Sequence, residues 1–343
     1  MKKVALIGAG GVVFGKHTEA YAALSERMQP WVVCDPSIEG SLKMREWAKI
    51  PDARYVQDLS GLDAFRDEVD LAVVATPVKY HQAAVEYALG LGWDVLCEKP
   101  LAMSIEEVDS MIDCAEAGQR RLGVIHNIYF MSEVRDTNAF IRNGHIGEVK
   151  FVQGHSHSQP WSGKEWRSDA SMGGKGHFFD CLYHEIYCAR SCIGSPISRV
   201  HAVEARLGQV PISVEDMLLC TMEFENGALA SFQDVKAFPE LAPAVFAAYG
   251  TEGAVIRTIP SADRLYVYRG KERSELPVDP ESSEEGTLGV FSRFIDAMES
   301  GGPLPYEIDA AGDGRENLRV IYAAYESAAT GNPVDMRTWR IRR

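Results

Sequence analysis

The feature that most constrains the fold is a glycine-rich segment that follows the first apolar run of the chain. Val4 to Ile7 form a short, uninterrupted apolar stretch, which is typical of a buried parallel strand. Three glycines then precede a helical pattern that runs from Gly15 to Met28: Gly8, Gly10 and Gly11. A glycine-rich turn between a strand and a helix lets the backbone approach a diphosphate, which the N–H groups of the helix N-terminus can bind. The segment therefore predicts a dinucleotide-binding turn, with Val13 where the third glycine of the G-x-G-x-x-G pattern would stand.

A second apolar run, Trp31 to Cys34, ends on Asp35, and this acid lies 20 residues after Gly15. Dinucleotide sites place an acid here to hydrogen-bond the adenosine ribose hydroxyls. The structural alternative is a helix cap before Ser37. No Arg or Lys follows Asp35 until Lys43, so no obvious cation would neutralise a 2′-phosphate, and we expect NAD rather than NADP as the cofactor.

Length and charge limit the classes of protein that are possible. A chain of 343 residues is long enough for two domains, each with a core of its own. The net charge of −14, with no basic block to offset it, argues against a nucleic-acid partner. No apolar stretch is long enough to cross a bilayer, and the first apolar run does not resemble a signal peptide. Seven scattered cysteines with no C-x-x-C pair fit a reducing compartment, so we expect a cytoplasmic protein without membrane contact.

The order of the expected elements divides the chain into two domains. Strands and helices alternate over residues 1–123, which predicts an α/β domain with a doubly wound parallel sheet. Over residues 124–343, strand-like segments follow one another with short links, and Glu225-Asn226-Gly227 reads as a hairpin turn. This second part predicts an α+β domain with a mostly antiparallel sheet. A helix at about 315–330 closes the chain and could pack back on the first domain.

Two stretches carry polar groups that a core would not require. Cys97-Glu98-Lys99-Pro100 directly follows an expected strand, and ligands of open α/β sheets bind at the carboxyl ends of strands. Lys99 would then lie beside the cofactor, although a lysine in an ordinary surface loop is the alternative. Asp180 and His184 are four residues apart, so on a helix they share a face. A carboxylate beside an imidazole suits proton transfer, and a half-buried histidine with purely structural partners is the alternative.

Taken together, these motifs resemble those of the glucose–fructose oxidoreductase/inositol dehydrogenase (GFO/IDH/MocA) family. The resemblance spans essentially the whole chain, in the family's order: Gly8-x-Gly10, His17, Glu98-Lys99-Pro100, Asp180-x-x-x-His184 after a glycine run, Tyr249-Gly250-Thr251-x-Gly253 and Tyr325-Glu326-Ser327-Ala328-x-x-Gly331. It implies a Rossmann domain followed by a domain with a large, open, mostly antiparallel sheet. It also implies a homodimer or homotetramer formed through that sheet.

The resemblance implies an NAD-dependent oxidoreductase that acts on a secondary alcohol or ketone of a sugar, cyclitol or sugar derivative. Lys99, Asp180 and His184 match the family's catalytic residues. His184 would take the proton of a substrate hydroxyl, Lys99 would hydrogen-bond the same oxygen, and Asp180 would orient the pair. The residues expected at the cofactor are Gly8, Gly10, Gly11, Val12, Asp35, Thr76, Pro77, His81, Glu98 and Lys99.

The substrate itself does not follow from the resemblance, because the chain departs from the family near the expected substrate. Tyr129 stands where many members carry Arg, and Tyr187 stands where many sugar and inositol dehydrogenases carry Asp. The candidate substrate residues are Asn127, Trp161, Arg167, His155 and His157. The sequence leaves the hydroxyl, the direction of the reaction and the choice between dimer and tetramer open.

Two other interpretations compete with a dehydrogenase. The cofactor could stay bound and be recycled while a glycoside undergoes net elimination, hydrolysis or epimerisation. The chain could instead be a non-catalytic dinucleotide-binding sensor, although Lys99, Asp180 and His184 are all present. A zinc site is a separate question, because four potential ligands recur at helical spacing: His177, Cys181, His184 and Cys188. One straight helix cannot easily surround a metal tetrahedrally, so we expect no metal.

Overall fold

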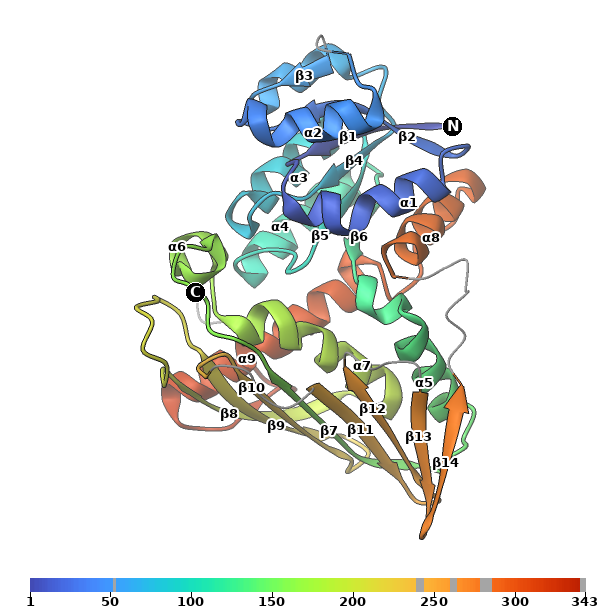
Figure 1. Ribbon diagram of the computed structural model, residues 1–343, viewed down its shortest axis with the longest axis vertical. Helices are drawn as coiled ribbons and strands as arrows, with labels where there is room; N and C mark the ends of the chain where they lie inside the picture. The colour runs from blue at the N-terminus through green and yellow to red at the C-terminus, as the bar shows by residue number, and fades with distance from the viewer. Residues whose placement is uncertain (52–53, 239–243, 260–263, 278–285, 340–343) are drawn as a thin grey trace. The chain divides into compact units, whose positions relative to one another are not determined.

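The structure is a computed structural model that describes residues 1–51, 54–238, 244–259, 264–277 and 286–339. The chain divides into two compact units (Figure 1). The first unit comprises Met1–Phe130 and Ser283–Glu316, and the second comprises Met131–Ser282 and Asn317–Arg343. All seven cysteines are free thiols. In the described ranges, no helix combines the length and the apolar character that crossing a membrane requires.

The first unit contains a six-stranded parallel sheet in the order β3-β2-β1-β4-β5-β6. Its strands are β1 (Lys2–Ile7), β2 (Met28–Cys34), β3 (Tyr55–Val56), β4 (Leu71–Val74), β5 (Asp94–Glu98) and β6 (Leu122–Ile125). Strands β4, β5 and β6 are buried along their whole length, as expected of parallel strands covered on both faces. The doubly wound parallel sheet predicted from the sequence is confirmed.

Helices connect these strands. They are η1 (Val13–His17) running into α1 (Thr18–Ala23), α2 (Ile38–Ala48), η3 (Leu59–Phe65), η4 (Val78–Tyr80) running into α3 (His81–Gly90), α4 (Ile105–Ala117) and η5 (Asn127–Phe130). Ser104 caps α4 by accepting a hydrogen bond from the Glu107 N–H at 3.1 Å. The first helix ends at Ala23, earlier than its pattern suggests, because Met28 already pairs with Lys2 in the sheet. Pro30 is tolerated in β2 because β3 pairs only with the last two residues of that strand.

A segment from late in the chain completes the core of the first unit. Helix α8 (Gly286–Ser300) contacts α1, β6 and η5, and η8 (Ala310–Gly314) contacts β6. Phe291 and Phe294 belong to the same buried cluster as Leu6 and Tyr21. Gly123 leaves room for this packing, because a Cβ there would lie 2.8 Å from the Phe294 ring. The sequence predicts one domain boundary, after residue 123, whereas each compact unit of the structure consists of two separate segments of the chain. It is α8 that packs on the first unit, whereas α9 (Arg315–Thr330) groups from Asn317 onward with the second.

The second unit is built on a nine-stranded sheet in the order β14-β13-β12-β11-β7-β10-β9-β8-β15. The strands are β7 (Val149–His157), β8 (Ile197–Ala205), β9 (Met217–Phe224), β10 (Leu229–Val235), β11 (Ala244–Gly250), β12 (Ala254–Ile259), β13 (Arg264–Arg269), β14 (Glu272–Pro277) and β15 (Val334–Asp335). Only β7 and β10 run parallel among the neighbouring strands described. The mostly antiparallel sheet is therefore confirmed, and the β9–β10 hairpin turns at Gly227, whose φ is +83°.

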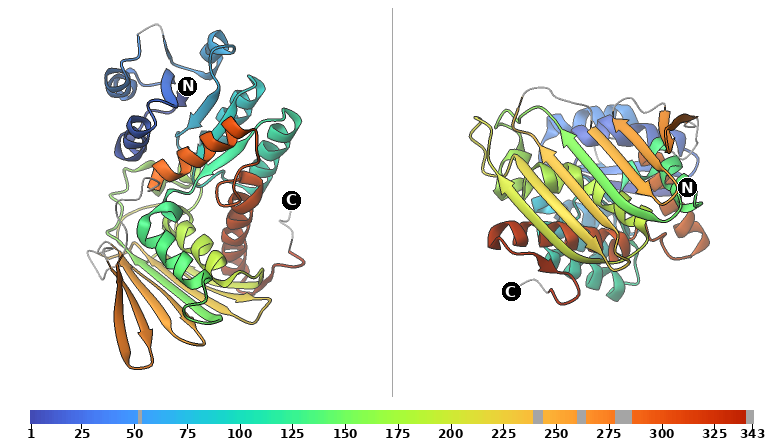
Figure 2. Two further views of the ribbon diagram at one scale, coloured as in Figure 1. Left: turned by 90° about the vertical axis from the view of Figure 1, so that its right-hand side faces the viewer. Right: turned by 90° about the horizontal axis from the view of Figure 1, so that it is seen from below.

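Helices cover one face of this sheet, and the other face is open in both views of Figure 2. The covering helices are α5 (Ser132–Arg142), α7 (Tyr183–Ile193), which continues from η7 (Phe178–Leu182), and α9. Two short helices lie in the connection before η7: η6 (Trp166–Ser168) and α6 (Ala170–Gly173). Side chains alternate along β9 between buried and exposed, which matches a sheet with one face packed and the other not covered by the chain.

Candidate active site

The glycine turn after β1 has the geometry that a diphosphate needs. Gly8 has a φ of +90°, and a Cβ there would lie 2.8 Å from the backbone of Ala75 and Thr76. Only glycine fits this position. A Cβ on Gly10 or Gly11 would meet no other atom within 4 Å, so the turn presents bare backbone to open space.

The missing third glycine has a simple structural explanation. Val13, which replaces it, is fully buried in the core at the start of η1. A Cβ on Gly15 would meet nothing within 4 Å, so Gly15 is not required for close packing. The helix in this chain therefore packs through a valine side chain where the common pattern brings helix and strand together at a glycine.

Asp35 lies at the carboxyl end of β2 and contacts the glycine turn directly. Its Oδ2 accepts a hydrogen bond from the Ala9 N–H at 2.8 Å, and its Oδ1 accepts one from the Ser37 N–H at 2.8 Å. The carboxylate therefore caps the segment before α2, as the structural alternative expected, and it also contacts the turn, whereas its bond to a ribose stays a prediction. An acid in this place fits the ribose of a dinucleotide.

The loops after β4 and β5 are tied together by His81. Its Nε2 lies 2.9 Å from the Thr76 carbonyl oxygen, and its Nδ1 lies 3.0 Å from that of Pro100 and 3.2 Å from that of Leu101. Burial lowers the pKa of His81. Both ring nitrogens thus contact backbone, so the structure shows a brace between the two loops, and contact of His81 with the cofactor stays a prediction. Within the ranges that the structure describes, the buried Thr76 hydroxyl has no hydrogen-bond partner, as expected of a group that binds a ligand.

Glu98 is buried and engaged by its own chain. Its Oε1 lies 2.8 Å from the His17 Nε2, and its Oε2 accepts a hydrogen bond from the Lys99 N–H at 3.2 Å. Burial alone would raise the pKa of Glu98, but the hydrogen bond and charge of His17 and the charge of Lys99 outweigh it, so the pKa is lowered. Glu98 therefore anchors the backbone that carries Lys99. The sequence motif includes His17 but does not reveal that it pairs with Glu98.

The residues predicted on the second unit lie on η7 and α7. The Asp180 carboxylate pairs with Arg167, with Oδ2 and Nε 3.1 Å apart. His184 is 5% exposed, and its Nδ1 lies 3.1 Å from the hydroxyl of Tyr187, one helical turn later. The partner found for His184 is thus Tyr187, which sequence reasoning noted only as a departure from the family.

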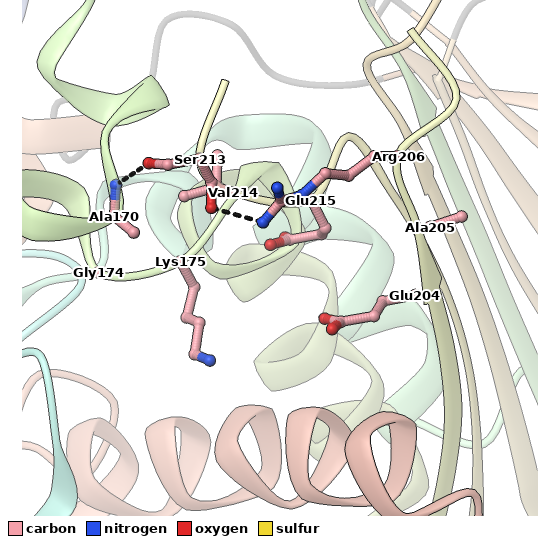
Figure 3. Close-up of a pocket in the computed structure, with 9 residues that line it drawn as sticks. All are labelled: Ala170, Gly174, Lys175, Glu204, Ala205, Arg206, Ser213, Val214 and Glu215. Atoms are coloured by element: carbon pink, nitrogen blue, oxygen red, sulfur yellow. Dashed lines mark hydrogen bonds between the residues drawn. The ribbon is translucent and has the colours of Figure 1, made fainter. Parts of the chain in front are cut away.

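Close packing explains the glycine run before η7. A Cβ on Gly173 would lie 3.1 Å from the Arg167 backbone, and one on Gly176 would overlap Glu215. Glu215 is held by the Gly176 N–H at 2.8 Å and by the Tyr325 hydroxyl at 2.7 Å. Beside this run lies a pocket of about 310 Å³, into which Lys175 and Glu204 point (Figure 3). Neither Asp180 nor His184 lines it, so its volume says nothing about the reaction.

The candidate substrate residues come from both compact units of the chain, and their contact with a substrate stays a prediction. Asn127 is 7% exposed at the start of η5 in the first unit. Trp161 is 8% exposed, with its ring edge-on to His177 and the Lys236 Nζ 5.3 Å from its centroid. Arg167 is paired with Asp180 as described.

His155 and His157 lie on the open face of the nine-stranded sheet. They share the alternation of half-buried residues along β7, whereas Val152 is fully buried on the face that the helices cover. The His157 Nε2 lies 3.0 Å from the Gln233 Nε2 on the neighbouring strand. Because α7 packs against the other face, the structure does not bring these two histidines to His184.

The partners of His177 give no support to a zinc site. Its Nδ1 lies 2.7 and 2.8 Å from the two carboxylate oxygens of Asp234, and its Nε2 lies 3.2 Å from the Ser158 hydroxyl. Burial alone would lower the pKa of His177, but the charge of Asp234 outweighs it and raises the pKa to about 10. Across the residues described, no three potential metal ligands cluster.

The six-stranded parallel sheet, its glycine turn and Asp35 define a Rossmann dinucleotide-binding unit. Comparison with known proteins identifies the family within this class. Residues 2–126 match the oxidoreductase family with an NAD-binding Rossmann fold, and residues 134–256 match the GFO/IDH/MocA C-terminal domain. The chain belongs to the GFO/IDH/MocA family, as its motifs predicted. It is an oxidoreductase, and NAD is its cofactor.

Individual relatives agree with this assignment. The chain is 28% identical to 1,5-anhydro-D-fructose reductase of Ensifer adhaerens over 79% of this chain and 81% of that protein. It is 32% identical to 2,7-anhydro-N-acetylneuraminate hydratase of Escherichia coli over 54% of this chain and 52% of that one. A solved levoglucosan dehydrogenase in complex with NADH and L-sorbose has the same fold, with a TM-score of 0.85, 24% identity and 98% coverage of both chains.

Proposed function

We propose that this protein interconverts a secondary alcohol and a ketone of a sugar, cyclitol or sugar derivative. The observation that carries the proposal is His184, a buried imidazole whose Nδ1 lies 3.1 Å from the Tyr187 hydroxyl. The names of the relatives support a carbohydrate substrate, and two of them are named for anhydro sugars. When bound, the nicotinamide supplies the acceptor or donor of the hydride.

The proton is handled by the chain. During oxidation, His184 accepts the proton of the substrate hydroxyl, so that the substrate O–H bond breaks and an N–H bond forms. The Lys99 ammonium donates a hydrogen bond to the same oxygen and stabilises the negative charge that develops there. Glu98, held by His17, fixes the backbone of Lys99, and Arg167 holds the carboxylate of Asp180. Reduction of a ketone runs through the same groups in reverse.

The test is turnover by catalytic-site variants. Purified protein and NAD are mixed with inositols, aldoses, glycosides, sugar acids and anhydro sugars, and fluorescence of the reduced cofactor is followed. On the best substrate, we expect Lys99→Ala and His184→Ala each to lower kcat by about 100-fold or more. Lys150→Ala and His145→Ala, which change exposed residues away from these groups, serve as controls and should keep wild-type turnover. Near-normal turnover in both site variants would refute the assignment.

A second candidate function is favoured by the relative named as a hydratase. In that case the cofactor is retained, a glycoside is oxidised and later reduced within one cycle, and no net reduction accumulates. A flat fluorescence trace with NAD retained through gel filtration and a change in product mass would identify this activity. A sustained rise in fluorescence would exclude it.

We also propose that two copies of the chain pair through the open face of the nine-stranded sheet. Three large apolar side chains stay exposed there on adjacent strands: Val203 (56%), Leu219 (40%) and Leu229 (49%). Val203 and Leu219 lie directly opposite each other in the β8–β9 ladder. Light scattering should give the mass of a dimer or tetramer, and Leu219→Asp should lower it. A wild-type protein that is monomeric at all concentrations tested contradicts the proposal.

A further inference from the structure

Helix α7 places Tyr187 one turn after His184, and the two side chains meet inside the second unit. Tyr187 is 1% exposed and His184 is 5% exposed, and their rings are nearly perpendicular with centroids 5.7 Å apart. The Tyr183 ring stands edge-on to both of them. The imidazole is thus held by rings on two sides as well as by the bond from Nδ1 to the Tyr187 hydroxyl.

We propose that Tyr187 is a positioning residue that keeps the proton of neutral His184 on Nδ1, so that Nε2 is the nitrogen that exchanges a proton with the substrate. This inference rests on the proposed role of His184. A neutral imidazole carries one donor and one acceptor nitrogen, and the partner of one nitrogen decides which is which. A tyrosine hydroxyl can accept from Nδ1–H or donate to Nδ1, and only the bond in which it accepts leaves Nε2 unprotonated, as the proposed role of His184 requires. Nε2 then has the lone pair that a general base requires.

A second histidine of the same unit shows what a different partner would do. His177 has a carboxylate, Asp234, against its Nδ1, and its pKa is raised to about 10. Such a histidine stays protonated at neutral pH and cannot accept a proton. A hydroxyl carries no full negative charge, so it can orient the ring of His184 without stabilising the imidazolium as a carboxylate does. The Tyr187 hydroxyl therefore suits a ring that must both take and return a proton.

The direct experiment is the ¹⁵N NMR spectrum of the histidine side chains in the wild-type enzyme, with His184 assigned by comparison with His184→Gln. Protonated and unprotonated ring nitrogens have well-separated shifts, so the spectrum reports the tautomer independently of activity. We expect Nδ1 to be the protonated nitrogen of His184 at a pH where its ring is neutral. A wild-type ring with its proton on Nε2 would overturn the proposal without any variant.

Kinetics of Tyr187→Phe provide the second readout. Removing only the hydroxyl should lower kcat by about tenfold or more, because part of the gain from general-base catalysis is lost, and should leave KM for the sugar within about twofold. The variant should also show a mixture of tautomers. Tyr183→Phe is the matched comparison, since it removes a hydroxyl from the other ring against His184 but keeps the Tyr187 bond. Tyr183→Phe should retain the wild-type tautomer of His184. If both variants changed the tautomer of His184 to the same extent, the positioning role of Tyr187 would be contradicted.

The outcomes separate this inference from the proposed function. If His184→Ala abolishes turnover while Tyr187→Phe keeps wild-type kcat and tautomer, His184 is the base and Tyr187 does not position it. If His184→Ala retains turnover, the proposed role of His184 as the base fails, and Lys99→Ala then decides whether the proposed function fails with it. Thermal unfolding of each variant shows whether a loss of kcat comes from a damaged fold.

Discussion

At the scale of single residues, the structure gives several polar side chains two tasks. Asp35 caps the segment before α2 with one oxygen and contacts the glycine turn with the other. His81 joins two loops, and Glu98 anchors the backbone of the neighbouring lysine. The hydrogen bonds of Asp35, His81 and Glu98 hold the loops at the carboxyl ends of the strands in place without a ligand.

The position of Asp35 leads to a prediction about cofactor choice. A 2′-phosphate next to this carboxylate would be repelled, so NADH should bind at least about tenfold more tightly than NADPH, a difference of about 1.4 kcal/mol. Asp35→Asn should lower the ratio of the NADPH dissociation constant to the NADH dissociation constant. Glu39→Gln removes the same charge from the exposed first turn of α2 and should leave the ratio as in wild type. Fluorescence titration with both reduced cofactors measures it, and tighter NADPH binding to the wild-type protein would contradict the prediction.

The motifs of the sequence locate the candidate residues but not their partners. Glu98-Lys99-Pro100 and Asp180-x-x-x-His184 are local patterns, and each lies at the strand end or helix where it was predicted. His17 is 81 residues from Glu98, and nothing local shows that they meet. Arg167 was predicted at the substrate, and its ion pair with Asp180 was not foreseen. Such pairs are set by tertiary packing, which a single sequence without aligned relatives does not report.

At the scale of elements, the strand-to-helix turn after β1 depends on one residue. Gly8 combines a positive φ with backbone atoms of the β4 loop at the place where a side chain would begin. The turn and the end of β4 are therefore fixed relative to each other by contact between backbones. The elements themselves were predictable from apolar runs and glycines, whereas the replacement of a glycine contact by the buried Val13 was not.

We predict that Gly8→Ala lowers both stability and cofactor binding. Strain at positive φ and the overlap with Ala75 and Thr76 should lower the free energy of unfolding by more than about 1 kcal/mol. Gly90→Ala, at the exposed end of α3, is the control, because its Cβ would meet nothing within 4 Å. Urea unfolding and NADH titration measure the two effects. Equal stability of the two variants would show that the turn can relax.

At the scale of the whole molecule, buried titratable groups make stability depend on pH. Burial raises the pKa of Glu215 to about 7, only partly offset by its hydrogen bonds, and Asp234 raises that of His177 to about 10. The folded protein therefore holds the protons of Glu215 and His177 more tightly than the unfolded chain does. Such protons favour the folded state at low pH, and their contribution falls as pH rises through each interval between unfolded and folded pKa.

We predict two successive losses of stability as pH rises. Glu215 should contribute a loss between about pH 4.5 and 7, and His177 a loss between about pH 6.5 and 10. Asp234→Asn should flatten the second interval, because His177 then loses its carboxylate partner. Urea unfolding midpoints at pH 6, 8 and 9.5 measure this effect, with His145→Gln, which changes an exposed histidine, as control. Parallel wild-type and Asp234→Asn profiles would refute the role of the pair.

The return of α8 to the first unit has a consequence for how the protein is made. A ribosome releases the chain from its N-terminus, so the Rossmann sheet emerges first and eight of the nine strands of the second sheet follow before α8 appears. Until then the buried cluster that contains Leu6 and Tyr21 lacks Phe291 and Phe294. The unit that is synthesised first is thus completed late, and the nascent chain must keep an unfinished core out of contact with other chains for most of its synthesis.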